Sequence, residues 1–424
     1  MKNRQAKIKY ADIWGLREEK YKFLEDHDVK STKWQELQPK ESNYFYVPKD
    51  VRGDKEYSKF ISLRDIFIKY NAGIATGKDD VLVDFDKQSL VRKLSFHDKD
   101  TFELSMQSYK VHNDLINEWF NELDSKDINN QIISYNYRPF DSRFTIYNSI
   151  ILQRSRKDIM NNFLNKNLGL CVTKQLSSKN FYHALITDSF IDRCYISLQT
   201  REVTYVFPLW EYRSTISPRV LTSQDQLGLI DFGKNQILNF KTNFYGSMEY
   251  RYGKDIYISP EEIFYYIYAI LYSNIYRLKY QEFLKIDFPR IPFTKDYSLF
   301  KELGELGREL VNFHLLKSQE LNNPISKFHG GNGNRVEKRE YDEKGKRVYI
   351  NKQQYFDNVE SEIWNYYIGG YQVLDKWLKD RKGRVLSSED IKHYCKVATA
   401  LSKTIEIQKK IDELYPEVEK NLLK

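Results

Sequence analysis

The sequence predicts an α+β protein, in which a mixed α/β subdomain is followed by a mainly helical subdomain with one β-hairpin. Two observations support this fold class. Short runs of β-branched and aromatic residues, separated by Gly, Asn, Asp or Ser, recur along the first 255 residues, with helical segments between them. Beyond that point the patterns are helical, and their ends carry capping residues and prolines. A chain of 424 residues is long enough for two or three structural units.

The first part of the chain divides at about residue 55. We expect residues 1–55 to form a linker, whose residues from about 8 to 24 are either a polar helix or irregular. An extended segment follows, because Pro39 and Pro48 forbid a long helix there. Residues 56–255 form the mixed α/β subdomain. Its expected strands are the runs richest in β-forming residues, at 66–68, 81–83, 132–135, 144–147, 168–173 and 203–209.

Capping residues mark the expected helix starts. Ser155 is the expected cap of a helix over 156–165. Ser259 and Pro260, followed by two acids, begin a helix that runs to about residue 285 and opens the helical subdomain, residues 256–424. Next we expect a helix over 297–321, which ends before Asn322-Asn323-Pro324, and a hairpin of 336–341 with 347–350. Two more helices follow, over 371–380 and 389–415. The last begins at the capping box of Ser387 and Asp390 and ends at Pro416.

Composition narrows the class of protein. Hydrophobic residues make up 41% and charged residues 30% of the chain, which is typical of a folded protein rather than a disordered one. The 33 Tyr and 25 Phe have two explanations: the codon usage of an AT-rich genome, or a surface whose rings stack on bases beside Lys and Arg. The net charge of +8 permits a polyanionic partner without requiring one.

The cysteines and the apolar segments exclude further classes. Cys171, Cys194 and Cys395 lie far apart, so they cannot form a disulfide framework or a four-ligand zinc site, and they fit a reducing cytoplasm. The most apolar stretch, residues 263–276, contains five tyrosines and is too short to span a bilayer. No apolar signal-peptide core follows the basic N-terminus. We therefore expect a cytoplasmic protein with no membrane partner.

The sequence lacks a complete catalytic motif. It contains no GxxxxGK[ST], GxSxG or HExxH pattern, and its seven histidines have no metal-ligand spacing. The glycine-rich residues 330–334 lie between a proline and a hairpin, which is typical of a flexible loop. Asn323-Pro324-Ile325 lacks the second proline and the aromatic residue with which amino-methyltransferases hold a flipped adenine. We expect no catalytic, cofactor or metal site in this chain.

The first of three basic clusters suited to nucleic acid lies at residues 135–143. Arg138 and Arg143 stand among aromatic residues at a strand-to-turn junction. An arginine forks onto guanine or phosphate, and a tyrosine ring stacks on a base, so both arginines are candidate DNA contacts. The alternative is an Arg–Asp pair, in which Asp141 fixes one of the two arginines.

The other two clusters lie on a loop and at a helix end. Lys174 and Gln175 begin a loop that reaches Lys179; its glutamine could read adenine and its lysine could meet phosphate, while the alternative is an exposed polar loop. Residues 376–384 concentrate five positive charges that suit phosphate, although a helix dipole alone also favours cations there. These five candidate contacts are Lys376, Lys379, Arg381, Lys382 and Arg384.

Several of these segments resemble one known family. Residues 368–381, Ile-Gly-Gly-Tyr-Gln-Val-Leu-Asp-Lys-Trp-Leu-Lys-Asp-Arg, look like the closing signature of type ISP restriction–modification enzymes, which join a nuclease, an ATP-driven motor, an adenine methyltransferase and a specificity domain. Residues 73–79 are similar to the start of specificity domains in type IIG-like adenine methyltransferases, which adds Thr76 and Lys78 to the candidate DNA contacts. Further segments agree in order, at 137–143, 207–209, 266–271, 276–277 and 283–292.

The resemblance covers nearly the whole chain and implies a module that recognises a specific sequence in double-stranded DNA. Residues 10–21 resemble the exit from the methyltransferase domain, and in the family the S-adenosylmethionine-binding and catalytic motifs lie upstream of that exit. We therefore expect a fragment, a truncated product or a separate subunit that works with a bacterial methyltransferase domain. Two other functions stay open: a self-sufficient adenine-specific DNA methyltransferase, and a protein-interaction scaffold.

Overall fold

The computed structural model describes residues 6–39, 44–48, 53–124, 127–199, 202–212, 230–231, 236–252, 256–331 and 333–423. The chain forms two compact units, Met1–Lys55 and Glu56–Lys424. Among the described residues, no helix combines the length and apolarity needed to cross a membrane.

The first unit contains a small antiparallel pair and one helix. Strand β1 (Ile8–Tyr10) pairs with β2 (Gln35–Leu37), and helix α1 (Arg17–Asp26) lies between them in the sequence. The helix predicted over 8–24 is therefore displaced toward the C-terminus. It starts late because Gly15 takes a positive φ of 118° and the Glu19 carboxylate accepts a hydrogen bond from the Leu16 amide at 2.8 Å, which together set the N-terminus of α1.

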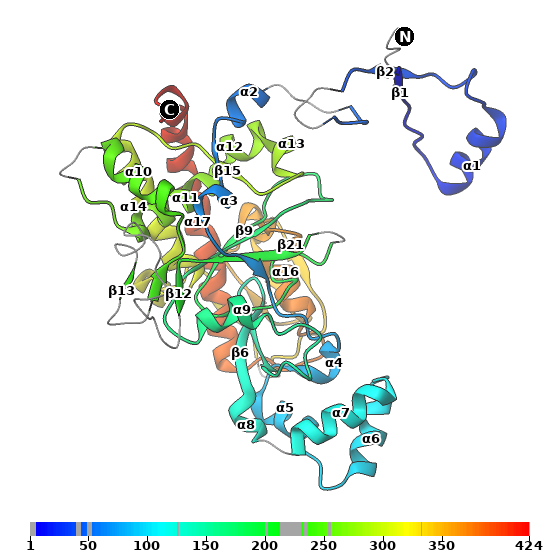
Figure 1. Cartoon of the computed structure of the whole chain (residues 1–424). Helices are drawn as coiled ribbons and strands as arrows, with labels where there is room; N and C mark the ends of the chain where they lie inside the picture. The colour runs from blue at the N-terminus through cyan, green and yellow to red at the C-terminus, as the bar shows by residue number, and fades with distance from the viewer. Residues whose placement is uncertain are drawn as a thin grey trace. The chain divides into compact units, whose positions relative to one another are not determined.

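The second unit begins with a series of short helices and strands (Figure 1). In chain order they are α2 (Asp54–Tyr57), β3 (Ile61–Ser62), α3 (Leu63–Ile66), β4 (Asn71–Ala72), α4 (Asp79–Leu82), β5 (Val83–Asp84), α5 (Lys87–Leu94), α6 (Lys99–Ser108), α7 (Asn113–Asp124), α8 (Ile128–Gln131), β6 (Ile132–Arg138), β7 (Asp141–Ile146), α9 (Lys157–Met160), the 3₁₀ helix η1 (Asn161–Phe163), β8 (Gly169–Thr173), β9 (Ala184–Thr187), β10 (Phe190–Ile191), β11 (Thr204–Pro208), β12 (Trp210–Tyr212), β13 (Ile230–Asp231), β14 (Gln236–Leu238) and α10 (Thr242–Tyr252).

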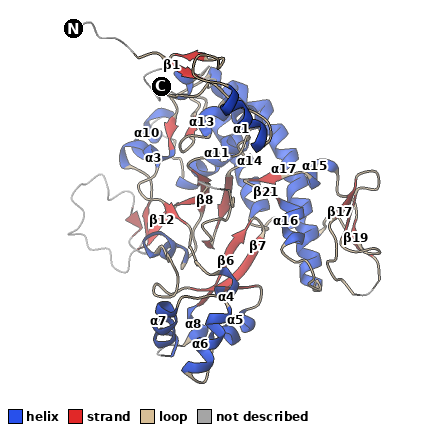
Figure 2. Ribbon diagram, turned by 90° about the vertical axis from the view of Figure 1, so that its right-hand side faces the viewer, coloured by secondary structure: helices blue, strands red, loops and turns tan. Residues whose placement is uncertain are grey.

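Two four-stranded sheets organise this part. One has the order β10-β6-β7-β5, and the other has the order β4-β11-β8-β9. The strands predicted at 132–135, 144–147, 168–173 and 203–209 are confirmed as β6, β7, β8 and β11. Helices α5 to α8 gather at one end of the unit, next to β6 (Figures 1 and 2). The predicted α+β class is confirmed.

Three local predictions in this part are wrong. Residues 66–68 and 81–83 are mostly not strands, because helical turns extend into them. The Ser62 hydroxyl caps α3, which ends at Ile66, and two aspartates open α4, which ends at Leu82. Ser155 does not cap the following helix. Arg156 occupies that position instead, in the left-handed region with φ 55° and no side-chain cap.

The later part of the second unit is mainly helical, as the sequence predicts. Its elements are α11 (Pro260–Tyr272), α12 (Asn274–Lys279), α13 (Gln281–Leu284), β15 (Arg290–Ile291), α14 (Tyr297–His314), the 3₁₀ helix η4 (Gln319–Asn322), β16 (Phe328–His329), β17 (Glu340–Asp342), β18 (Arg347–Tyr349), β19 (Tyr355–Phe356), α15 (Ser361–Trp364), β20 (Tyr367–Ile368), β21 (Tyr371–Gln372), α16 (Val373–Lys379) and α17 (Ser388–Lys420).

Capping sets the boundaries of these helices. The predicted start at Ser259 is confirmed, with a reciprocal capping box to Glu262. The expected single helix to residue 285 is wrong: the chain breaks at Ser273, whose hydroxyl accepts the Tyr276 amide at 3.1 Å and starts α12. The predicted hairpin is confirmed in β17 and β18, which belong to a larger sheet of order β16-β19-β18-β17.

Helix α17 continues past the proline at which the sequence predicts its end. Pro416 lies inside the helix, so the predicted stop is wrong. Tyr415 and Val418 on either side of it are both fully buried. Burial of these two side chains offsets the hydrogen bond that the proline removes, and the helix persists to Lys420.

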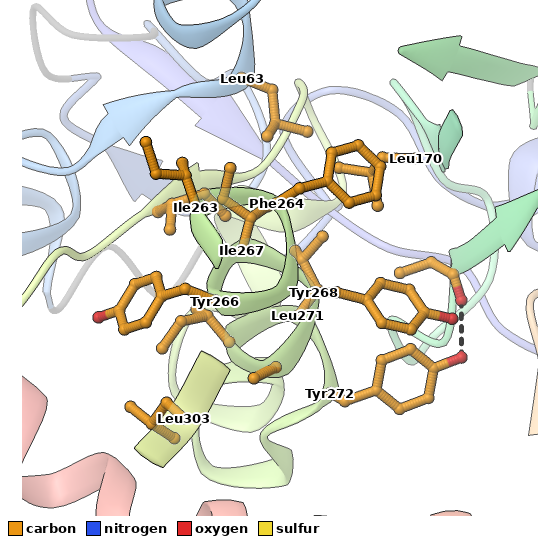
Figure 3. Close-up of a cluster of buried hydrophobic side chains, with 14 of the residues drawn as sticks. Leu63, Leu170, Ile263, Phe264, Tyr266, Ile267, Tyr268, Leu271, Tyr272 and Leu303 are labelled. Carbon is orange, nitrogen blue, oxygen red and sulfur yellow. Dashed lines mark hydrogen bonds between the residues drawn. The ribbon is translucent and has the colours of Figure 1, made fainter. Parts of the chain in front are cut away.

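The first of two hydrophobic cores surrounds α11. Its side chains pack against Leu63 of α3, Leu170 of β8 and Leu303 of α14 (Figure 3). Helix α14 approaches closely because Gly307 has no Cβ; one built there would lie 2.0 Å from the carbonyl oxygen of Tyr265. Three tyrosine hydroxyls on α11 stay bonded in this apolar setting, and the Tyr272 hydroxyl donates to the Ala184 carbonyl at 2.9 Å (Figure 3).

The second core joins the β6–β7 sheet to α16, to the start of α17 and to the β16–β19 sheet. Tyr135 of β6 and Trp377 of α16 are both fully buried in it. The two cores thus draw side chains from both sides of residue 255. The subdomain boundary placed there from the sequence stays a prediction, and packing joins the two parts.

Candidate nucleic-acid interface

The β6–β7 hairpin carries the first predicted cluster. Its turn is tight, with Phe140 in the left-handed region at φ 57° and a register shift between Asn136 and Arg138. The Asp141 carboxylate, just after the turn, is only 2% exposed. The hairpin lies beside α16 and α17 (Figure 2), so a buried carboxylate faces a helix that ends in cations.

Arg138 points into the protein. Its side chain is 4% exposed, and its Nη1 pairs with Asp192 Oδ1 at 2.8 Å. The guanidinium also lies over the Tyr137 ring, 3.6 Å from its centroid. Burial raises the pKa of Asp192 to about 6, against the opposing effect of Arg138. Arg138 therefore takes the ion-pair alternative, with Asp192 rather than Asp141 as its partner, and is not exposed to a DNA base.

Arg143 is also engaged within the protein. It donates from Nε and Nη2 to Asp141 Oδ2, at 3.1 and 2.9 Å, and from Nη2 to Asp380 Oδ2 at 3.0 Å. Its guanidinium lies between two rings, 4.0 Å from the centroid of Tyr137 and 4.1 Å from that of Phe85. The Arg–Asp141 alternative left open from the sequence holds for this arginine.

Arg381 links the hairpin to the distant basic segment. Its Nη2 pairs with Asp141 Oδ1 at 2.8 Å, and its guanidinium lies 3.6 Å from the Trp377 ring centroid. Burial alone would raise the pKa of Asp141, but the Arg381 and Arg143 guanidiniums outweigh it and lower that pKa. The two clusters predicted separately thus meet in one buried network. We call this network, together with the neighbouring Arg138–Asp192 pair, the ionic junction; its residues are Arg138, Asp141, Arg143, Asp192, Asp380 and Arg381.

Lys376 belongs to the same internal network. Its Nζ lies 2.5 and 2.7 Å from the two carboxylate oxygens of Asp380, one turn later on the helix. Burial lowers the pKa of Lys376, and the neighbouring Arg138 and Arg143 add to this effect. Lys376 is thus engaged with Asp380 inside the protein.

The other cations of this segment reach solvent. Lys379, Lys382 and Arg384 are exposed, and the Arg384 guanidinium lies 4.3 Å from the Phe85 ring centroid. A fourth exposed cation, Arg335, donates from Nη1 to the Gly383 carbonyl at 2.6 Å. We call these four residues the basic rim.

Thr76 connects the loop of residues 73–79 to the same hairpin, whereas Lys78 bonds to a different segment. The Thr76 hydroxyl donates to Asp79 Oδ1, and Asp79 Oδ2 accepts from the Tyr137 hydroxyl at 2.8 Å. Lys78 Nζ donates to the Lys110 carbonyl at 2.6 Å. Thr76 is buried and Lys78 half-buried, so their first partners are within the chain.

The Lys174–Lys179 loop is held by a different buried acid. Glu202 Oε1 accepts from the Ser177 and Ser178 amides at 2.8 and 2.9 Å. Burial opposes the charge on Glu202, but hydrogen bonds from His183 and Ser197 lower its pKa strongly. Gln175 and Lys179 are exposed and Lys174 is half-buried, so this loop presents polar side chains on a fixed backbone.

Gly369 and Gly370 place the signature turn against the same region. Gly369 has φ 57°, and a Cβ there would lie 2.1 Å from the Ile196 carbonyl oxygen; at Gly370 it would lie 2.5 Å from Ser197 Oγ. The Tyr371 hydroxyl then donates to the Cys194 carbonyl at 2.8 Å. The Gly-Gly-Tyr signature therefore reflects close packing, which only glycine permits.

Several contributing residues escape prediction from the sequence. Phe85 contacts three guanidiniums, and Asp192 and Asp380 neutralise buried arginines. Nothing in their local sequence marks them. Arg335 directly follows the glycine-rich residues 330–334, and this position is the signal that could have added it to the candidates. Within the described ranges, no group of three or more His, Cys, Asp or Glu residues is placed to hold a metal ion.

A family model described as the Type ISP C-terminal specificity domain matches residues 65–410. No curated protein matches the chain.

Three solved structures share the fold. A nuclease-deletion mutant of the Type ISP restriction–modification enzyme LlaGI, in complex with a DNA substrate mimic, matches 95% of this chain with a TM-score of 0.68 and 19% identity. The ATP-dependent Type ISP enzyme LlaBIII bound to DNA matches 89%, with a TM-score of 0.65 and 19% identity. A DrdV–DNA complex matches 97%, with a TM-score of 0.69 and 18% identity. This chain spans 33%, 25% and 43% of those three chains, respectively.

Proposed function

This chain belongs to the family of Type ISP C-terminal specificity domains, and from this membership we propose that it recognises a specific DNA sequence for a restriction–modification enzyme. Family membership over residues 65–410 is the observation that carries the proposal. It is supported by the shared fold of LlaGI, LlaBIII and DrdV, whose structures are complexes with DNA or a DNA mimic.

The basic rim is the proposed phosphate contact. Lys379, Lys382 and Arg384 are exposed, and no carboxylate among the described residues pairs with them. Cations of this kind release counterions from the DNA backbone and bind every duplex alike. The rim therefore supplies affinity and orientation, and it carries no sequence preference of its own.

The loop after β8 is the proposed base reader. Gln175 is exposed, and its amide can donate to and accept from the major-groove edge of adenine. The Glu202 hydrogen bonds to the Ser177 and Ser178 amides fix the backbone of this loop, which reduces the entropy lost on binding. We propose that Lys179, which is also exposed, meets a phosphate beside the base that is read.

Burial changes the roles proposed for three arginines. Arg138, Arg143 and Arg381 are engaged by carboxylates and aromatic rings inside the ionic junction. We propose that Arg143 and Arg381 hold the β6–β7 hairpin against the end of α16, and that Arg138 holds the hairpin to Asp192. Substitution of Arg138 should then lower stability, rather than change sequence preference as its sequence context suggests.

The methyl donor belongs to a partner domain under this proposal. An S-adenosylmethionine site needs an open glycine-containing loop. The loop at Gly73 is not open, because a Cβ there would lie 2.6 Å from the Asp192 backbone, so the protein itself fills the space beside this glycine. Gly73 therefore does not form such a loop. We propose that an adenine-specific methyltransferase domain or subunit holds the S-adenosylmethionine and associates with this chain. We also propose that the assembly works in the cytoplasm.

Fluorescence anisotropy with labelled duplexes tests the proposal. The chain, alone and with the methyltransferase domain of its enzyme, should bind duplex DNA with an affinity that falls steeply as salt rises. Absence of duplex binding at low salt in both preparations would contradict DNA recognition. Calorimetric binding of S-adenosylmethionine to the chain alone would favour the self-sufficient methyltransferase instead.

A further inference from the structure

A cavity of about 290 Å³ lies among side chains of α12, α15 and α17. None of its lining residues belongs to the ionic junction or the basic rim. Its volume is at the lower end of the roughly 300–1,000 Å³ that small-molecule sites occupy. The chemistry of its walls identifies the kind of ligand that fits.

Arg277 lines this cavity and lacks a full set of partners. The residue is 6% exposed. Its Nε donates to the Leu271 carbonyl at 2.6 Å, and its guanidinium lies 4.4 Å from the Tyr272 ring centroid. Nη2 is buried and has no hydrogen-bond partner within the described part of the chain. Arg277 pairs with no carboxylate among the described residues, and a buried cation without a counter-charge is costly, so it favours an anion in the cavity that it lines.

The charges around Arg277 keep the cavity positive. Lys409 is a second lining cation, and Glu362 is the single lining carboxylate among the described residues. These two lie 3.7 Å apart with about two-thirds of each side chain exposed, so their pair is at the solvent side. Burial lowers the pKa of nearby His314 to about 3, with a smaller contribution from Arg277, so the imidazole stays neutral beside this guanidinium.

Aromatic rings form another part of the wall. The Tyr182 and Tyr367 rings face each other at an interplanar angle of 28°, with 6.2 Å between their centroids. The Tyr366 hydroxyl donates to Gln408 Oε1 at 2.9 Å, which leaves a fixed polar edge beside the rings. Aromatic faces of this kind stack on nucleobases, whatever the base.

We propose that this cavity binds a nucleotide phosphate, with Arg277 and Lys409 bonding the phosphate oxygens and the tyrosine rings contacting the attached base. A guanidinium matches phosphate oxygens in geometry and charge. The phosphate can come from a free nucleoside monophosphate or from a phosphodiester of DNA. This inference does not depend on the proposed function, since it rests on residues outside the basic rim.

Isothermal titration calorimetry with three probes tests the proposal and separates the two sources. The probes are deoxyadenosine monophosphate, the dinucleotide d(TpT) and deoxyadenosine, which has no phosphate. The expected result is binding of at least one phosphate probe and none of deoxyadenosine. A preference for the monophosphate identifies a free nucleotide, and a preference for d(TpT) identifies DNA. If neither phosphate probe binds at millimolar concentration, the proposal is wrong.

Matched variants link binding to the cavity. Lys409→Gln should weaken phosphate binding about fivefold, and Glu362→Gln should strengthen it, because the first removes and the second adds net positive charge. Both side chains are exposed, so neither change should unfold the protein. Lys410→Gln, one residue along α17 and also exposed, is the control and should bind as the unmodified chain does. Equal affinities in the Lys409→Gln and Lys410→Gln variants would overturn the assignment.

Discussion

The ionic junction and the basic rim both contain arginines, and both draw residues from the segment 376–384. The two differ in burial. Arg381 is buried against Asp141 and Trp377, whereas the next residue, Lys382, is exposed. A buried cation must be paired, so its substitution should affect folding. An exposed cation without a carboxylate partner contributes little to stability and is free to meet phosphate. The comparison teaches that burial, rather than residue type, separates the two roles.

The largest expected effect is on the junction. Asp141→Ala removes the carboxylate shared by Arg143 and Arg381 and leaves two enclosed guanidiniums without it. Breaking a buried pair in this way costs about 3–5 kcal/mol. Urea denaturation should show this loss in the free energy of unfolding. Lys382→Ala is the control and should change it by less than about 0.5 kcal/mol. Similar losses in both variants would remove the distinction between junction and rim.

The second effect concerns sequence discrimination. Gln175→Ala should reduce the preference for the cognate duplex by about 1–3 kcal/mol, because a bidentate amide–adenine contact is lost. Competition between the cognate duplex and duplexes with single A·T-to-G·C changes would locate the affected base pair. Asn180→Ala, in the same loop and also exposed, is the control. A uniform loss of affinity for all duplexes would place Gln175 among the phosphate contacts instead.

The third prediction concerns His314, a buried titratable residue that, unlike the arginines of the ionic junction, has no acidic partner. The His314 imidazole bonds to Tyr268 at 2.6 Å and to Thr404 at 2.9 Å, and burial lowers its pKa to about 3. Because the unfolded chain protonates near pH 6.5, stability from His314 is complete above that pH and falls as pH decreases toward 3. Between pH 6.5 and 5 the expected loss is about 1.5 kcal/mol.

Denaturation at both pH values isolates this contribution. Between pH 6.5 and 5 the free energy of unfolding of His314→Gln should fall by about 1.5 kcal/mol less than that of the unmodified chain, because the titrating imidazole is gone. Asp192, whose raised pKa acts in the opposite direction, is present in both proteins and cancels in the difference. Equal slopes in the two proteins would contradict a neutral buried His314.

The smallest expected effect is on the rim. Lys382→Ala or Lys379→Ala should weaken binding to every duplex alike and reduce the slope of log affinity against log salt by about 0.9. Anisotropy titrations at several salt concentrations would measure that slope. Lys344→Ala, at the exposed turn between β17 and β18, is the control and should leave it unchanged. An unchanged slope for both rim variants would mean that the rim does not meet phosphate.

Local signals in the sequence predict much of the fold. The capping box of Ser259 and Glu262 marks the start of α11 because its hydrogen bonds form within four residues. Breaks set by packing are harder to predict. Helix α11 ends at Ser273, which also binds Asp412 of α17 at 2.8 Å, and α17 continues through Pro416 because residues around it are buried. Both outcomes depend on contacts between segments far apart in the chain.

The candidate site follows the same rule. The sequence shows the clusters at 135–143 and 376–384 as charge patterns. For the first cluster it also allows an ion pair between Asp141 and one arginine instead of a DNA contact. The pairing of Asp141 with Arg381 joins residues 240 positions apart, so no local pattern indicates it. Exposure decides which cations are available to DNA, and exposure follows from that long-range packing.

Selection from a library of randomised duplexes tests the central claim most directly. The chain, alone and with the methyltransferase domain of its enzyme, would be incubated with the library at physiological salt, and the bound duplexes would be sequenced over several rounds. Sequence-specific recognition predicts enrichment of one short sequence, with the enrichment reduced by Gln175→Ala and kept by Lys382→Ala. Recovery of duplexes as diverse as the starting library, in both preparations, would contradict it.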